Sequence, residues 1–155
     1  MKVVIDTNVL IDGDQDENSH ANKIVGEVLE GRIQAFANKK TMQENSGILH
    51  KLIKNSEYLR RVEEMLGQVG RVSPERVDAV PNDRQDTKIL ASAVAAQADY
   101  LITSDHDLLD IEEYRGIKII DPVSFWNVYR QENLGENDWQ KFINQFLKKV
   151  DGICR

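Results

Sequence analysis

The sequence lacks the features that are typical of secreted and membrane proteins. It contains a single cysteine, Cys154, so no disulfide can form within it. No apolar run approaches the roughly 20 residues that a membrane-spanning helix needs, and Met1 and Lys2 lead directly into a strand-like run without room for a signal peptide. We therefore expect a soluble protein of the reducing cytoplasm with no membrane partner.

Proline and low-complexity sequence are also scarce. The 155 residues include three prolines and no internal repeat, so nothing suggests a linker before the last thirty or so residues. This length suffices for one domain with a real core. We expect a single domain over residues 1–130, followed by a connector and a C-terminal amphipathic helix over 131–155.

Positive charge is in the minority. The net charge of -6 argues against broad adhesion to nucleic acid, although clustered acids can produce that sign while another face stays basic. Cations that could hold a nucleic acid backbone, or simply form a solvated face, are Lys39, Lys40, Lys51, Lys54, Arg60, Arg61, Arg84 and Lys88.

Apolar residues alternate between strand-like runs and helical spacing. Strands are expected at 3–5, 33–37, 68–72, 100–103 and 118–120, and helices at about 21–29, 41–53, 56–69, 85–98 and from 122 onward. This order implies a parallel sheet covered by helices on both faces, an α/β/α arrangement with five strands.

The C-terminal segment carries a separate apolar stripe. Its members recur at helical spacing and are Trp139, Phe142, Ile143, Phe146, Leu147 and Val150. Two interpretations are open: the helix packs on its own domain, or it meets a partner or second subunit.

Acidic residues stand where two expected strands end. Asp6 follows the first strand, and Asp105, with Asp107 beside it, follows the strand at 100–103. In a doubly wound parallel sheet, ligands bind outside the carboxyl ends of the strands. These acids are therefore expected to converge on one crevice.

Two helical acids are expected to point toward the same crevice. Asp86 falls within the apolar face of the helix at 85–98, in its first turn, and Glu44 lies at the edge of the apolar stripe of the helix at 41–53. Each acid also has an ordinary explanation, as a turn residue, a helix cap or a solvated side chain. Two unscreened carboxylates about 4 Å apart repel by roughly 4 kcal/mol at an effective dielectric of about 20. Such a cluster needs bound cations or extra protons, and all-oxygen ligands favour Mg²⁺ or Mn²⁺.

Four blocks of sequence carry a family resemblance. "VVIDTNVLID", Glu44 in the second helix, "DRQDTKILASAVAAQADYLITSDHDLL" and "IKIIDPVSFW" resemble the PIN domain family, particularly the stand-alone prokaryotic branch that includes VapC-type toxins. The resemblance covers about residues 1–129. It implies a five-stranded parallel sheet between helices and a metal-dependent nuclease.

The resemblance also implies site residues and partners. Its metal-binding, catalytic acids correspond to Asp6, Glu44, Asp86 and Asp105, and the auxiliary residues are Asp107, Thr103, Thr7 and Asn8. It implies an endoribonuclease that uses one or two Mg²⁺ or Mn²⁺ ions on single-stranded or looped RNA. An antitoxin protein and a second copy of the chain are the protein partners to consider.

Other functions compete with this hypothesis. An aspartyl phosphotransferase would need an acid two residues after Asp6, where Asn8 stands, and a receiver domain would need an acid after the third strand, where Ser73 stands. The remaining alternative is a catalytically silent PIN-like module that binds RNA or protein.

Overall fold

A computed structural model describes residues 1–16, 18–73, 84–133, 143–144 and 146–149. The side chain of Arg84 lies outside what the structure describes, as do Trp139, Phe142 and Val150 of the C-terminal stripe. The chain forms two compact units, residues 1–122 and 123–155.

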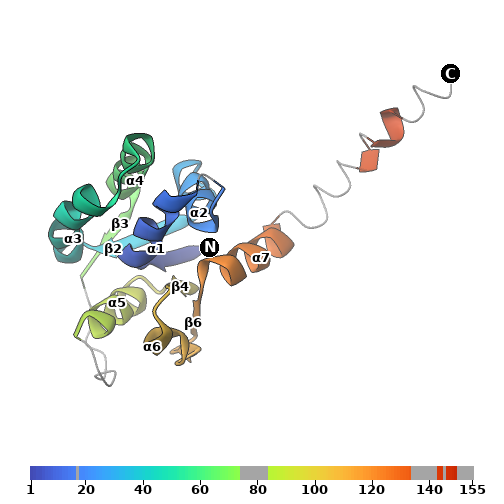
Figure 1. Ribbon diagram of the computed structural model, residues 1–155. Coiled ribbons are helices and arrows are strands. Elements are labelled where there is room, and N and C mark those ends of the chain that lie inside the picture. The colour runs from blue at the N-terminus through green and yellow to red at the C-terminus, as the bar shows by residue number, and fades with distance from the viewer. Residues whose placement is uncertain (17, 74–83, 134–142, 145, 150–155) are drawn as a thin grey trace. The chain divides into compact units, whose positions relative to one another are not determined.

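A mostly parallel sheet organises the first unit (Figure 1). Its strands are β1 Lys2–Ile5, β2 Gln34–Asn38, β3 Gly70–Val72, β4 Tyr100–Ile102, β5 Glu113–Tyr114 and β6 Ile117–Ile120. They lie in the order β3-β2-β1-β4-β6-β5. The mixed α/β fold and the five predicted parallel strands are confirmed.

The prediction of five strands omits β5, which pairs antiparallel with β6 at one edge. This strand has two residues, too few to produce an alternating pattern in the sequence. Arg115 and Gly116 make the connecting turn, both with positive φ, at 48° and 81°. Two left-handed residues are what a tight two-residue hairpin requires.

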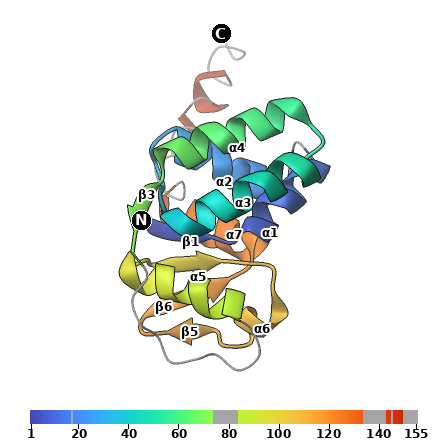
Figure 2. The same ribbon diagram turned by 90° about the vertical axis from the view of Figure 1, so that its left-hand side faces the viewer.

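Helices connect the strands and cover the sheet (Figure 2). They are α1 Thr7–Asp12, η1 Gly13–Gln15, α2 His20–Leu29, α3 Lys39–Leu52, α4 Ser56–Gln68, α5 Arg84–Ala95 and α6 His106–Leu109. α5 packs on β1, β2 and β4, and α2 packs on α4. The short α1 and α6 were not predicted, because neither is long enough to show helical periodicity.

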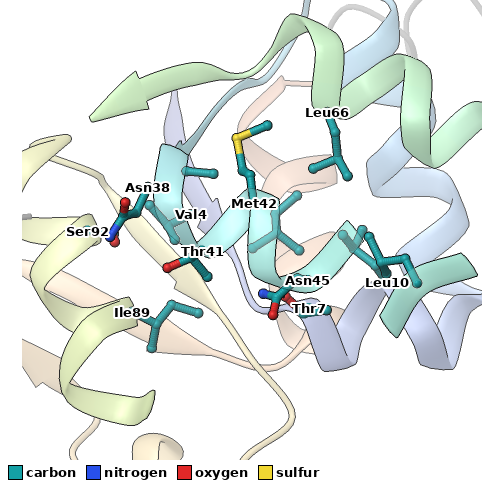
Figure 3. A pocket seen from close by; sticks show the side chains of 13 residues that line it. Val4, Thr7, Leu10, Asn38, Thr41, Met42, Asn45, Leu66, Ile89 and Ser92 are labelled. Atoms are coloured by element: carbon teal, nitrogen blue, oxygen red, sulfur yellow. The ribbon is translucent and has the colours of Figure 1, made fainter. Parts of the chain in front are cut away.

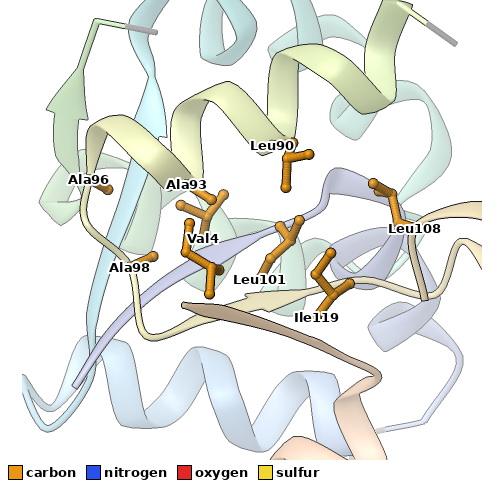
Figure 4. Close-up of a cluster of buried hydrophobic side chains, with 9 residues drawn as sticks. Val4, Leu90, Ala93, Ala96, Ala98, Leu101, Leu108 and Ile119 are labelled. Atoms are coloured by element: carbon orange, nitrogen blue, oxygen red, sulfur yellow. The ribbon is translucent and has the colours of Figure 1, made fainter. Parts of the chain in front are cut away.

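The core between α5 and the sheet uses small side chains on the helix and branched ones on the strands. The cluster comprises Val4, Leu90, Ala93, Ala96, Ala98, Leu101, Leu108, Ile117 and Ile119. Figure 4 shows these side chains between α5 and the sheet, with α2 on the other side of the strands. The small, buried Ala93 allows α5 to approach the strands closely. Because α5 lies between the parallel strands β3 and β4 in the chain, it runs antiparallel to them and starts at the carboxyl edge of the sheet.

The second unit contains α7, Pro122–Asn133, except for its first residue, and further helical residues at 143–144 and 146–149. In α7, Phe125 stacks on Tyr129 with ring centroids 6.0 Å apart, and both side chains are buried. Phe146 and Leu147 are exposed. α7 spans the predicted domain boundary at residue 130, so that division stays a prediction.

Candidate metal centre

The strand order places two acids at the topological switch of the sheet. β1 pairs with β2 on one side and β4 on the other, so the chain reverses its direction of winding between β1 and β4. Asp6 follows β1, and Asp105 follows β4 after a short turn. Adjacent parallel strands leave a crevice at such a point, outside their carboxyl ends.

Asp6 is held by hydrogen bonds to both of its carboxylate oxygens. It is the N-cap of α1, where Oδ1 accepts from the backbone N–H of Asn8 at 3.3 Å. Thr103 Oγ1 donates to Oδ2 at 2.8 Å. Burial raises the pKa of the Asp6 carboxyl, and the nearby charge of Asp105 raises it further, while both hydrogen bonds lower it. The net upward shift shows that the site disfavours an uncompensated charge here.

Thr103 links the two strand ends. Its hydroxyl donates to Asp6 and accepts from the backbone N–H of Asp105 at 3.1 Å. The side chain is fully buried, so these bonds are not exchanged for bonds to solvent. Asp105 is in turn the N-cap of α6, with Oδ1 accepting from the N–H of Asp107 at 2.9 Å. Oδ1 of Asp105 is thereby engaged with the backbone at the start of α6.

Three carboxylates from two parts of the chain converge beside Asp6. Asp86, Asp105 and Asp107 each offer an oxygen, and these oxygens lie within 4.8 Å of one another. Asp86 is buried on the first turn of α5, as its helical spacing predicts, whereas Asp107 is exposed. Neither Asp105 nor Asp107 forms an ion pair with a lysine or arginine side chain that the structure describes.

An open pocket of about 320 Å³ lies in front of these acids. Asp6, Asp86 and Asp105 contribute to one wall, with Thr7, Asn8 and Lys88. The remaining lining residues are Ile11, Thr41, Asn45, Ile48, Leu52 and Ile89. The pocket therefore combines carboxylates with polar and apolar side chains of α3.

The structure places Glu44 apart from the other predicted ligands. Its side chain is exposed and does not line the pocket. Thr41 and Ile48, which lie three residues before and four residues after it on α3, do line the pocket. The backbone of Glu44 therefore lies toward the pocket side of α3, since residues three and four apart share a helix face.

Asn45 is a site residue that sequence reasoning missed. Its Nδ2 donates to Thr7 Oγ1 at 2.7 Å and so joins α3 to the start of α1 (Figure 3). It also lines a second cavity, of about 60 Å³, beneath α3. A signal was present, because Asn45 falls between Met42 and Leu49 at spacings of three and four, on the inward face.

The donor set fits a hard divalent cation. Carboxylate oxygens from Asp86, Asp105 and Asp107 are close enough to share one ion, and Asp6 stands beside them with a raised pKa. No histidine or cysteine belongs to this group, and all-oxygen sites favour Mg²⁺ or Mn²⁺ over softer metals.

Comparison with known proteins decides the family. A family model described as PIN domain matches residues 2–107, a segment that contains Asp6, Glu44 and the cluster of Asp86, Asp105 and Asp107. The chain belongs to the PIN domain family. PIN domains are generally metal-dependent nucleases, so the family indicates a nuclease-type function, and the acidic cluster is compatible with a bound metal ion. Neither a search of curated proteins nor a search of solved structures gave a match.

The length and hydrophobicity of the helices bear on whether the chain could cross a membrane. Among the described residues, no helix combines the length and apolar character that crossing a bilayer requires.

Proposed function

We propose that this PIN domain protein is an endoribonuclease that hydrolyses phosphodiester bonds in single-stranded or looped RNA, using Mg²⁺ or Mn²⁺. The convergence of Asp86, Asp105 and Asp107 beside Asp6, at the switch point of a PIN domain, carries the proposal. A nuclease needs a cation at such a place, because an acidic pocket otherwise repels a polyanionic substrate.

Each acid has a proposed role. Asp86 and Asp105 hold the ion, Asp107 holds it from the solvent side, and Asp6 completes the shell with its geometry set by Thr103. When bound, one or two such ions acidify a water molecule and stabilise the charge that develops on the phosphate oxygens. Thr7 and Asn8 fix the turn that carries Asp6.

Glu44 remains a proposed member of this set. Its backbone lies toward the pocket side of α3, and its exposed side chain is unconstrained by any hydrogen bond or ion pair to the described residues. In the proposal it orients the attacking water from the α3 side, as the family resemblance implies.

The test is cleavage of labelled single-stranded RNA by the purified protein with Mg²⁺, Mn²⁺ or EDTA. We expect cleavage that EDTA abolishes and that Asp86→Asn and Asp105→Asn each reduce by about 100-fold or more. Asp110→Asn is the matched control, because Asp110 is an exposed acid just after α6 and outside the cluster. Binding of RNA without cleavage would instead favour the catalytically silent module.

We also propose a biological role, as the toxin of a type II toxin-antitoxin pair, on the resemblance to VapC-type toxins. Expression of the chain alone should arrest growth, and Asp105→Asn should relieve the arrest. A small adjoining reading frame whose product restores growth would supply the antitoxin. Normal growth during expression of active nuclease would contradict this role while leaving the enzymatic proposal intact.

A further inference from the structure

A groove that differs from both cavities described above lies on another side of α3. This α3–α4 groove has a volume of about 470 Å³ and is lined by Lys39, Met42, Gln43, Ser46, Glu63, Leu66, Gly67 and Arg71. The pocket in front of the acids is lined by Thr41, Asn45, Ile48 and Leu52 of the same helix. The two sets occupy different sides of α3, because their positions differ by more than a third of a turn. Figure 2 shows α3 and α4 running side by side, with β3 at the end of the pair.

The groove presents two cations without acidic partners. Lys39 and Arg71 are exposed, and neither forms an ion pair with a carboxylate that the structure describes. Glu63, the acid in the groove, bonds instead to His50 Nε2 on α3. Gln43 and Ser46 add an amide and a hydroxyl that can donate hydrogen bonds. This combination of donors suits a phosphate group, for which the planar guanidinium of arginine is the preferred side chain.

The sheet aligns the groove with the candidate metal centre. Lys39 directly follows β2, and Arg71 lies in β3 opposite Ala37 of β2. Asp6 and Asp105 follow β1 and β4, the next two strands in the sheet. Because parallel strands end at the same edge, that edge carries Lys39 after β2 and acids after β1 and β4, with Arg71 one residue before the end of β3. The midpoint between β3 and β2 lies two strand spacings from the midpoint between β1 and β4, a distance of roughly 10 Å.

We infer that the α3–α4 groove binds a phosphate of the same single-stranded RNA, about one or two nucleotides from the bond that is cleaved. This inference rests on the proposed function. The charge division along the edge favours it, because one polyanion can then span the metal ions and the two cations. Met42 and Leu66 supply an apolar floor for the ribose or base between phosphates. The cations thus contribute affinity without reading sequence, as phosphate contacts do.

The test compares a double variant, Lys39→Gln with Arg71→Gln, with a control double variant, Lys23→Gln with Lys118→Gln. All four side chains are exposed, so each pair removes two positive charges from the surface without disturbing the core. The substrates are a dinucleotide, which is too short to reach the groove, and a ten-nucleotide single-stranded RNA. The measurements are kcat and KM for cleavage, and binding by fluorescence anisotropy at several salt concentrations.

For the ten-nucleotide RNA we expect the groove variant to raise KM by about tenfold with little change in kcat. Its binding should depend less on salt. The slope of the logarithm of the binding constant against the logarithm of salt concentration should be smaller by about 1.4, because each of two phosphate contacts to a single strand contributes about 0.7. Cleavage of the dinucleotide should be unchanged, and the control pair should behave as wild type. The charge-conserving pair Lys39→Arg with Arg71→Lys should restore most of the affinity.

The outcomes separate this inference from the proposed function. If wild type cleaves RNA and the groove variant matches the control pair, the inference is wrong while the nuclease proposal stands. If wild type binds RNA through the groove but never cleaves it, the nuclease proposal falls, and with it the placement of the groove beside a cleaved bond, while RNA binding by the groove stands. A third outcome concerns a polyglutamate peptide. If wild type binds this peptide, and the groove variant loses that binding but binds RNA as well as wild type does, the groove is a docking surface for an acidic protein and the inference is wrong.

Discussion

Thr103 acts on two of the proposed ligands through a single hydroxyl group. It donates to Asp6 and accepts from the N–H of Asp105, and it is fully buried. Because the hydroxyl has one hydrogen and that hydrogen is directed at Asp6, the second bond must use an oxygen lone pair. The positions of the acids therefore depend on a residue that does not need to touch the ion.

Substitution of Thr103 by valine keeps the shape of the side chain and removes both hydrogen bonds. We expect Mn²⁺ affinity to fall by about 10- to 100-fold, the usual effect of losing an outer-shell partner. Stability should fall by about 1–3 kcal/mol, because polar groups lose their partner. Isothermal titration with Mn²⁺ and thermal melting measure the two effects. Thr103→Ser retains the hydroxyl and serves as the control, so equal behaviour of the valine and serine variants would contradict this role.

The Asp6 carboxylate should destabilise the metal-free protein at neutral pH. Its pKa is raised in the folded state, chiefly by burial, so folding favours the protonated form. The unfavourable contribution of the charge to the free energy of folding is therefore fully present above the raised pKa. It disappears as the pH falls through the raised pKa toward 3.8, the ordinary pKa of an aspartate. Metal-free Asp6→Asn should therefore be at least as stable as wild type at pH 7, and this advantage should shrink on acidification.

Melting curves in EDTA between pH 4 and pH 7 check this expectation. Asp110→Asn controls for the loss of a general surface charge, because Asp110 is exposed. A clear decrease in the melting temperature of Asp6→Asn at pH 7 would mean that the carboxylate serves mainly as a helix cap.

At the scale of elements, α3 is the loosely held helix of the first unit. Of its 14 residues, Leu49 is the buried one, and Ile48 and Leu52 are each 45% exposed. The cavity of about 60 Å³ lies beneath it, and Asn45 anchors it to Thr7 (Figure 3). A helix with so few buried contacts opens at low free energy. Its position over the acids therefore depends strongly on the Asn45 hydrogen bond.

Removal of that bond should loosen α3 selectively. Asn45→Ala should lower stability by about 1 kcal/mol and speed hydrogen exchange in α3 while exchange in α5 is unchanged. Hydrogen exchange followed by mass spectrometry resolves the two helices. Lys40→Ala, an exposed substitution on the same helix, is the control. Equal exchange in both variants would show that packing at Leu49 holds α3 in place.

At the scale of the whole molecule, metal binding should couple to stability. The net charge is -6, and part of that negative charge is concentrated at one edge of the sheet. An ion that binds only the folded protein stabilises it by about 2.7 kcal/mol at a concentration 100 times Kd. We expect Mn²⁺ to raise the melting temperature of wild type and of Asp110→Asn but not of Asp105→Asn. A shift of equal size in all three proteins would place the ion elsewhere.

Part of the candidate site was predictable because its residues obey local rules. Asp6 and Asp105 end apolar runs, and Asp86 interrupts the apolar face of a helix, so strand ends and helical spacing locate them. Arg71 and Asn45 were not found. Arg71 lines the groove only because α3 and α4 lie beside it, and Asn45 makes a hydrogen bond to a residue 38 positions away. Helical spacing could have placed Asn45 on the inward face of its helix, but the identity of such distant partners leaves no mark on the local sequence.

By itself, the sequence determined the alternation of strands and helices and the acids that end the strands, because burial and chain geometry impose periods that side-chain types reveal. Only the tertiary structure decided that the side chain of Glu44 stands outside the pocket and that Asn45 lines it. It also decided that Lys39 and Arg71 line one groove, on strands next to those that the acids follow. Those relations depend on the order of strands in space and on the rotation of each helix, which are settled by packing between distant segments.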